Sequence, residues 1–295
     1  VMTEGNRLIY FMNDYSMKVA HERWSGGDYP GHHLWGMNSL NQEEWSVEFS
    51  NSPIPQYSWS HLLGINNNNR FALELAASPP ASRNIFCGSI HIFKLLGLLR
   101  SVGLFRRNLI PMIHHPVVPN AVNRRALANA DGLFFLNSFS HDRTVAEMPE
   151  LSERSHVVGW CVDTTFYDAK VQTLQPNPKL IVAAGKELRD YESLVRGVAL
   201  VADPDLRVEI YCSAETAPIT RDPRVSVYKG GLHGSPISYI DLLGRYQDAI
   251  AIAVPMLPVD RTVGMTSVFD AFASRRAVLI TQHPSIDAPI EANGL

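Results

Sequence analysis

Several features that would place a chain in a familiar class are scarce or missing in this sequence. It has three cysteines in 295 residues, with no pair at the short spacing of a zinc or redox motif, so we expect reduced, buried thiols at Cys87, Cys161 and Cys212. The longest apolar stretches, 90–99 and 249–257, are about half of the ~20 residues that cross a bilayer. No cleavable signal stands at the start, so we expect a cytoplasmic protein with no membrane span.

The sequence also lacks an excess of positive charge and the common phosphate-binding motifs. The net charge is -3, the pI is near 6.4 and no long basic run occurs, so nucleic acid is not an expected partner. Neither half has a G-x-G-x-x-G after its first strand candidate, and no Walker-type Gly-Lys-Ser/Thr occurs, which disfavours dinucleotide dehydrogenases and P-loop enzymes. The D-x-D at Asp203 and Asp205 joins a helix candidate to a strand candidate, so we predict a turn rather than a metal site.

What the chain does contain is an alternation of short apolar runs with segments of helical spacing, which predicts parallel sheets with helices on their faces. In the first half we expect strands at 8–12, 84–90, 109–113 and 132–136, helices at 32–40 and 92–105, and a loop at 66–69. In the second half we expect strands at 179–184, 207–212, 225–228, 249–257 and 278–282, and helices at 190–201, 238–246 and 265–277.

The polar stretch 163–178 separates the two halves. It contains two prolines and no periodicity, which is typical of a linker. We therefore predict an N-terminal domain over 1–165, a linker over 166–178 and a C-terminal domain over 179–295. Because the sequence stops soon after a strand-like element, we expect the C-terminal domain to be incomplete in it.

Two loops of the second domain have the character of anion sites. Gly264 lies where the loop after the 249–257 strand meets the next helix, so backbone N–H groups at that helix start can face an anion at the carboxyl ends of parallel strands. Gly185 similarly follows the first strand of the domain, and Lys186 and Arg189 come within one turn of it. Two such cations suit a diphosphate, although a short Lys/Arg pair is more often a solvated charged face.

The first domain offers histidines and glycines at comparable positions. His114 and His115 close a strand, and because adjacent strand residues point to opposite faces, only one of them can face a given ligand. The alternative is a structural histidine. A glycine-rich loop precedes His32, and its glycines would let a backbone approach a ligand; they are Gly26, Gly27 and Gly31. Aromatic residues around this loop would stack on a sugar face if they do not belong to the core; they are Trp24, Tyr29 and Trp35.

Four segments together resemble the retaining two-domain glycosyltransferases of the GT-B architecture, of the type called glycosyl transferases group 1 or family four. They are ADGLFFLNSFSHDRTVAE, VVGWCVDTTFYDA, KLIVAAGKELRDYESLVRGVALV and VGMTSVFDAFASRRAVLITQHPSI. The resemblance covers most of 130–295; before residue 130 it is only architectural. It implies an α/β fold of two Rossmann-like domains, mainly parallel sheets and an interdomain cleft.

The resemblance also implies an activity of hexosyltransferase type. The C-terminal domain would hold a nucleotide-diphosphate sugar donor, the N-terminal domain would hold the acceptor, and transfer would be metal-independent with retained configuration and no cofactor. The donor residues implied are Gly185, Lys186, Arg189, Gly264, Met265, Thr266, Ser267 and Asp270, with Asp270 on the ribose. His115 or His114 matches the residue expected near the donor sugar, and the loop with Gly26, Gly27, Gly31 and His32 would face the acceptor or sugar.

Two departures from the family pattern leave alternatives open. The family often has a glutamate at each end of an eight-residue step, where this chain has Thr262 and Asp270, and Lys186 stands where arginine is common. The alternatives are a nucleotide-sugar epimerase on the same fold, which needs a carboxylate base near the sugar, and a non-catalytic protein that binds a nucleotide sugar or a partner. The acceptor class stays open among glycans, lipids and small molecules, and a lipid acceptor would bring peripheral membrane contact.

Overall fold

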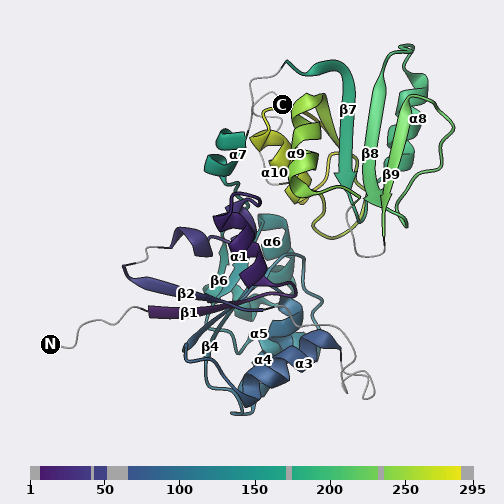
Figure 1. Cartoon of the computed structure of the whole chain (residues 1–295). Coiled ribbons are helices and arrows are strands. Elements are labelled where there is room, and N and C mark those ends of the chain that lie inside the picture. The colour runs from purple at the N-terminus through teal and green to yellow at the C-terminus, as the bar shows by residue number, and fades with distance from the viewer. Residues whose placement is uncertain (1–6, 41–42, 52–65, 171–174, 232–235, 287–295) are drawn as a thin grey trace. The chain divides into compact units, whose positions relative to one another are not determined.

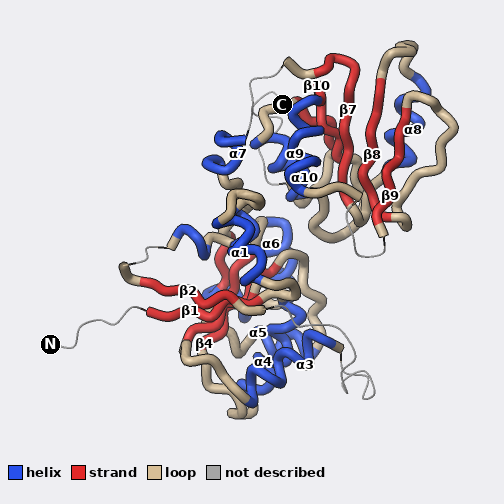
Figure 2. The backbone as a smooth tube through the Cα atoms, in the orientation of Figure 1, coloured by secondary structure: helices blue, strands red, loops and turns tan. Residues whose placement is uncertain are grey.

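The computed structural model describes residues 7–40, 43–51, 66–170, 175–231 and 236–286. The chain divides into two compact units. Unit 1 comprises residues 1–27 and 31–159, and unit 2 comprises residues 28–30 and 160–295. Each unit contains one parallel sheet, whose strands run side by side in Figure 2.

Unit 1 has a six-stranded sheet in the order β2-β1-β3-β4-β5-β6, with every described pairing parallel. Its strands are β1 Arg7–Met12, β2 Trp45–Phe49, β3 Asn84–Cys87, β4 Asn108–Ile113, β5 Leu133–Phe135 and β6 Ser155–Val157. Its helices are α1 Met17–Ser25, α3 Asn67–Ala77, α4 Ile90–Ser101, α5 Ala121–Leu127 and α6 Ser138–Glu147, with 3-10 turns η1 Gly31–Leu34, η2 Met37–Ser39 and η3 Pro149–Arg154. Helix α4 lies between α3 and α5 (Figure 1).

The core of unit 1 is centred on α4. Phe93 and Leu96 of this helix are fully buried with Leu109 of β4. Gly97 lies against α5: a Cβ added at this position would be 2.7 Å from the backbone oxygen of Ala126. The two helices therefore approach so closely that only glycine fits between them.

Unit 2 has a five-stranded sheet in the order β11-β10-β7-β8-β9, again with every described pairing parallel. Its strands are β7 Asn177–Gly185, β8 Arg207–Ser213, β9 Val225–Gly230, β10 Ala249–Val254 and β11 Ala277–Ile280. Its helices are α7 Thr164–Lys170, α8 Tyr191–Leu200, α9 Tyr239–Asp248 and α10 Met265–Ala273. The predicted strand and helix alternation of this half is confirmed.

Most described α-helices begin at a polar side chain that accepts a hydrogen bond from their own first turn, which is the usual local signal for a helix start. These capping residues are Ser16, Asn66, Ser89, Asn120, Asn137, Asp163, Asp190 and Ser238. Helix α10 is the exception among the described α-helices. It begins at Gly264, which has a φ of 74° and offers no side-chain hydrogen bond.

The structure corrects three of the local predictions. The predicted linker 166–178 includes most of α7, because Phe166 and Tyr167 are buried against α9, and it also includes the start of β7; residues 171–174 lie outside the described residues. The stretch 66–69 is not a loop, since Asn66 caps α3. The segment 32–40 is not one helix, because Trp35 and Gly36 have positive φ values and separate two 3-10 turns.

The cysteine prediction holds for two thiols and is wrong for the third. Cys87 and Cys212 are buried and free, whereas Cys161 is free but exposed. Cys161 follows Trp160 outside any helix or strand, so the apolar residues around it in the sequence do not form a strand that would cover it.

Candidate functional site

The loops that follow β7 and β10 are joined to each other in unit 2. The backbone N–H of Asp190 donates to the carbonyl of Pro255 at 3.1 Å, and the N–H of Leu257 donates to the carbonyl of Leu188 at 3.1 Å. These bonds lie at the carboxyl ends of two adjacent parallel strands. The predicted cationic loop and the predicted glycine loop are therefore neighbours, at the edge of the sheet where ligands of open α/β folds bind.

Arg189 connects the cationic loop to α10. Its Nη2 donates to the hydroxyl of Ser267 at 3.1 Å, and its Nη1 donates to the carbonyl of Glu187 at 3.0 Å. The Ser267 hydroxyl in turn donates to the carbonyl of Ala184, near the end of β7, at 3.2 Å. A Cβ on Gly185 would be 2.5 Å from Nε of Arg189, so this glycine lets the guanidinium lie against the backbone.

The positive charge of the Arg189 guanidinium has few compensating contacts in this position. Its Nε is buried, and among the described residues it has no hydrogen-bond partner. No ion pair joins it to a carboxylate in the described part of the chain. Burial lowers the pKa of Arg189, which means that the charge is held at an energetic cost. Such a group favours the approach of an anion.

Gly264 places the start of α10 beside this arginine. A Cβ on Gly264 would be 2.5 Å from Sδ of Met256 and 3.2 Å from a methyl group of Val254, so the helix start is packed directly on the end of β10. Met265 and Ser267 of the first turn are buried, and Thr266 is partly buried. Lys186, the other predicted cation, is exposed after β7.

Asp270 lies one turn further along α10 and is only 7% exposed. Its carboxylate accepts hydrogen bonds from the hydroxyls of Tyr167, at 2.6 Å, and Tyr239, at 3.0 Å. Burial raises the pKa of Asp270 to about 6, and the two tyrosine hydrogen bonds oppose that rise. Sequence reasoning did not find these tyrosine partners, and the contact of Asp270 with ribose stays a prediction. Thr262, the other departure from the family pattern, is buried at 8% exposure.

The raised pKa of Asp270 has a consequence for stability. Because the folded pKa of about 6 exceeds the ordinary value of 3.8, the folded state binds the proton more tightly than the unfolded state. The stability gained from this difference is complete below about pH 4 and is lost as the pH rises through 6. Asp270→Asn, which keeps the acceptor oxygen and cannot ionise, should therefore gain stability over wild type by about 2 kcal/mol between pH 4 and 7. Urea unfolding of both proteins at pH 4, 5, 6 and 7 measures this; a constant difference across the series would contradict it.

In unit 1, His114 and His115 follow β4 directly, as predicted, and His114 belongs to a polar cluster. Its ring is 4.8 Å from the ring of Trp35, and its buried Nε2 has no hydrogen-bond partner among the described residues. Burial, with a smaller effect of His115, lowers the pKa of His114 to about 4, so the ring is neutral near pH 7. Two further residues of this cluster directly follow β1 and β3: Nδ2 of Asn13 is buried and lacks a described partner, and it leaves no room for a Cβ on Gly88. No motif or periodicity in the sequence pointed to Asn13 or Gly88.

The glycine-rich loop has a structural role at the end of α1. Gly26 and Gly27 end the helix, with N–H groups that donate to Glu22 and Trp24, and Gly27 has a φ of 76°. Gly31 opens η1, and His32 is buried beside His33 with 4.4 Å between ring centres. Burial is the main reason that the pKa of His33 falls to about 3. That this loop contacts a ligand stays a prediction.

The described residues form neither a metal cluster nor a membrane-spanning helix. In the described part of the chain, no group of three or more His, Cys, Asp or Glu side chains is arranged to hold a metal ion. The D-x-D forms the predicted turn, in which the carboxylate of Asp203 accepts from the N–H of Asp205 at 3.0 Å and pairs with Lys179. No helix among the described residues is long and apolar enough to cross a membrane.

Comparison with solved structures identifies the fold class. Two Rossmann-like units with parallel sheets define the GT-B architecture, and the prediction of this fold class is confirmed. The chain is similar to an α,α-trehalose 6-phosphate synthase from Burkholderia multivorans, at 10% identity with a TM-score of 0.62, covering 97% of this chain and 86% of that one. A structure described as trehalose-6-phosphate from E. coli bound with UDP-2-fluoro glucose is similar at 12% identity with a TM-score of 0.60, over 94% and 84% of the two chains. A glycosyltransferase from Rickettsia africae matches at 10% identity with a TM-score of 0.57, over 97% and 81%. No protein-family model and no curated protein matches the sequence.

Proposed function

We propose that the chain is a glycosyltransferase of hexosyltransferase type that moves a sugar from a nucleotide-diphosphate sugar to an acceptor, with retained configuration and without a metal or cofactor. The observation that carries the proposal is the bond between Arg189 and Ser267. It joins the loop after β7 to the first turn of α10, the two segments that the family resemblance assigns to the donor. A half-buried guanidinium without a carboxylate, beside a helix start without a cap, is suited to a diphosphate.

The proposed chemistry assigns a task to each part of unit 2. When the bond between the anomeric carbon and the donor phosphate breaks, negative charge develops on the leaving nucleoside diphosphate. Arg189, Lys186 and the first N–H groups of α10 stabilise that charge, which is the role that a divalent metal has in other transferases. The positions of these groups are set before the donor binds, since Gly185 and Gly264 hold both loops against the strand ends.

Unit 1 is proposed to hold the acceptor and to contact the donor sugar. His114 is suited to hydrogen-bond a sugar hydroxyl as a neutral ring, because its pKa is lowered to about 4 and its buried Nε2 has no described partner. A neutral ring of this kind orients a hydroxyl and adds no charge. His115, Gly26, Gly27, Gly31 and His32 remain the other candidates on this side.

The donor is proposed to be a uridine diphosphate sugar in the first instance. The reason is the likeness in fold to the E. coli structure bound with UDP-2-fluoro glucose, and to a UDP-forming α,α-trehalose-phosphate synthase from Burkholderia vietnamiensis. The epimerase alternative needs a carboxylate base beside the sugar. Asp270, the buried carboxylate closest in sequence to the glycine loop, already accepts from two tyrosines, which favours transfer over epimerisation.

Calorimetric titration with UDP, GDP and ADP sugars, followed by assays for nucleotide release and for epimerised sugar, tests the proposal. We expect one donor class to bind and to release its nucleoside diphosphate, faster with an acceptor present than without. Epimerised donor without release would identify an epimerase. Binding with neither reaction would identify a binding protein, and the absence of binding to every nucleotide sugar would refute the donor site itself.

A further inference from the structure

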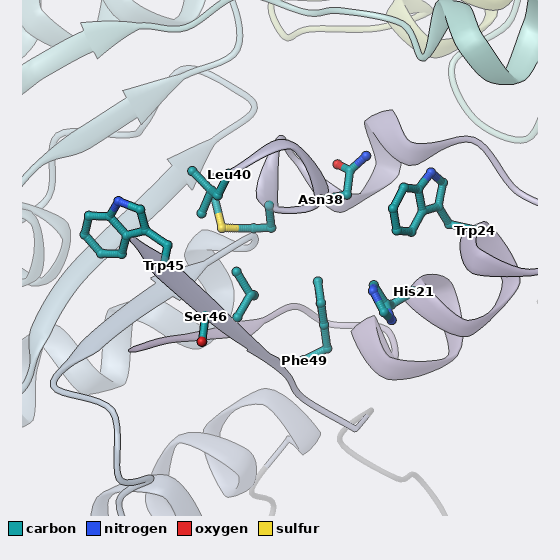
Figure 3. Close-up of a pocket in the computed structure, with 9 residues that line it drawn as sticks. His21, Trp24, Asn38, Leu40, Trp45, Ser46 and Phe49 are labelled. Carbon is teal, nitrogen blue, oxygen red and sulfur yellow. The ribbon is translucent and has the colours of Figure 1, made fainter. Parts of the chain in front are cut away.

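A pocket of about 380 Å³ lies in unit 1, and none of the residues that line it is assigned to the donor. It is formed by α1, η2 and β2, the edge strand of the sheet (Figure 3). The described residues that line it are His21, Trp24, Met37, Asn38, Leu40, Trp45, Ser46, Val47 and Phe49. This volume is at the lower end of the roughly 300–1,000 Å³ typical of small-molecule sites.

The aromatic walls of the pocket are held in place by their own packing. Phe49 stacks on His21 with 4.3 Å between ring centres and 22° between planes, and His21 is 5.5 Å from Trp24. Trp45 lies at the other end of the pocket (Figure 3), and the guanidinium of Arg7 is 5.4 Å from its ring centre. Both indole rings are therefore positioned without a ligand, which lowers the entropic cost of binding one.

The polar groups of the pocket lie among these rings. Asn38 contributes an amide, which Figure 3 shows between the two tryptophans, whereas the Ser46 hydroxyl points away from the pocket, because neighbouring residues of a strand face opposite sides. Among the described residues, none forms a hydrogen bond with the Asn38 side chain or with either indole N–H. Donors and acceptors are thus available beside flat apolar surfaces.

The charges around the pocket select against an anion. No described lining residue is Asp, Glu, Lys or Arg. Four exposed glutamates are next to lining residues or close to them in sequence: Glu22, Glu43, Glu44 and Glu48. Two exposed arginines, Arg7 and Arg23, also lie next to the tryptophans, but the four glutamates outnumber them, so the balance of charge favours a neutral ligand over a phosphate or carboxylate.

We propose that this pocket binds a neutral saccharide, with pyranose C–H faces against Trp24 and Trp45 and hydroxyls on the Asn38 amide and the indole N–H groups. A sugar ring has apolar faces and a polar rim, and the pocket has the complementary arrangement. A purely apolar ligand would leave Asn38 and the indole N–H groups without partners, which binding normally disfavours. The site is independent of the donor site, and its existence does not require that the chain transfers sugar.

NMR spectra of protein labelled with ¹⁵N-tryptophan test the proposal through the indole N–H signals. The first measurement uses the wild-type protein. Glucose, maltose, cellobiose and chitobiose are the neutral probes, with glucose 6-phosphate as the charged probe and cyclohexanol as the apolar one. We expect two indole signals to shift saturably with at least one neutral saccharide, at a dissociation constant of about 1 mM or below, and to shift less with the phosphate. Trp24→Phe and Trp45→Phe assign the two signals.

Substitutions then locate the ligand. Trp45→Ala should weaken saccharide binding by about tenfold or more, because a stacking surface is lost, and Asn38→Ala should weaken it several-fold. Asn129→Ala is the matched change in unit 1 and should leave binding unchanged, because among the described residues the Asn129 side chain donates only to the carbonyl of Arg125. UDP titration of the same variants reports the donor site separately. Absence of shifts with every neutral saccharide, equal affinity in Trp45→Ala, or binding of cyclohexanol alone would overturn the proposal.

Discussion

Replacing Arg189 by methionine is expected to lower sugar transfer by about 100-fold or more, because the charge that offsets the leaving diphosphate is removed. The same change should leave unit 2 at least as stable as wild type. The guanidinium is held at a cost, with a lowered pKa and a buried Nε that lacks a described partner, and a methionine of similar length removes that cost. Transfer rates with saturating acceptor and thermal melting of the apo protein measure the two effects.

The combination of lost activity and retained stability distinguishes a binding arginine from a structural one. Arg189→Lys should recover part of the activity, because the charge returns without the two-pronged geometry of the guanidinium. Arg196→Met is the matched control, since Arg196 is exposed on α8 and, within the described ranges, its Nη2 donates only to the hydroxyl of Ser193. A melting temperature that falls in Arg189→Met with no change in donor affinity would show that Arg189 supports the loop and does not bind the donor.

Replacing Gly97 by alanine is expected to destabilise unit 1 by about 1–3 kcal/mol, the usual range for overpacking a core. The new Cβ would be 2.7 Å from a backbone oxygen of Ala126, and a backbone atom of α5 cannot move aside as a flexible side chain can. In an ordinary helix the same change is stabilising, by roughly 0.5–1 kcal/mol, because alanine loses less entropy on folding. The sign of the effect therefore reports the contact between α4 and α5.

Gly244→Ala in α9 is the matched control for this prediction. Gly244 is also inside a helix, and a Cβ at this position meets no described atom within 4 Å, so the variant should gain stability. Urea unfolding of both variants, followed by circular dichroism, compares the two. If Gly97→Ala were as stable as wild type or more stable, the close packing of α4 on α5 would be wrong.

The elements of unit 2 could be predicted from sequence because their signals are local. The apolar run before Gly264 has the length of a strand, and the segment after it has helical spacing. The structure has a strand, β10, and a helix, α10, at these places. The partners of Asp270 could not be predicted in this way. Tyr167 and Tyr239 are 103 and 31 residues away, and only the packing of α7 and α9 against α10 brings them to the carboxylate.

The same limit applies to the pocket of unit 1. Trp24 lies near the glycine-rich loop, so the sequence alone indicates that it could stack on a sugar. Nothing in the sequence indicates this for its counterpart Trp45. Trp45 reaches the pocket through the parallel pairing of β2 with β1, in which it lies opposite Arg7. Pairing between strands so distant in the sequence leaves no trace in the period of either strand, so a pocket at their edge becomes visible only once the register is known.

If a diphosphate binds at the uncapped start of α10, ligand binding and folding become two aspects of one equilibrium. Most other described α-helices complete their first turn with their own side chain, whereas α10 has no side-chain cap. A bound diphosphate would then act as the missing cap, and the free energy of binding would appear as resistance of unit 2 to unfolding, growing with the logarithm of ligand concentration. A thermal melt in the presence of candidate donors thereby becomes a search for the substrate of a protein whose sequence matches no family model.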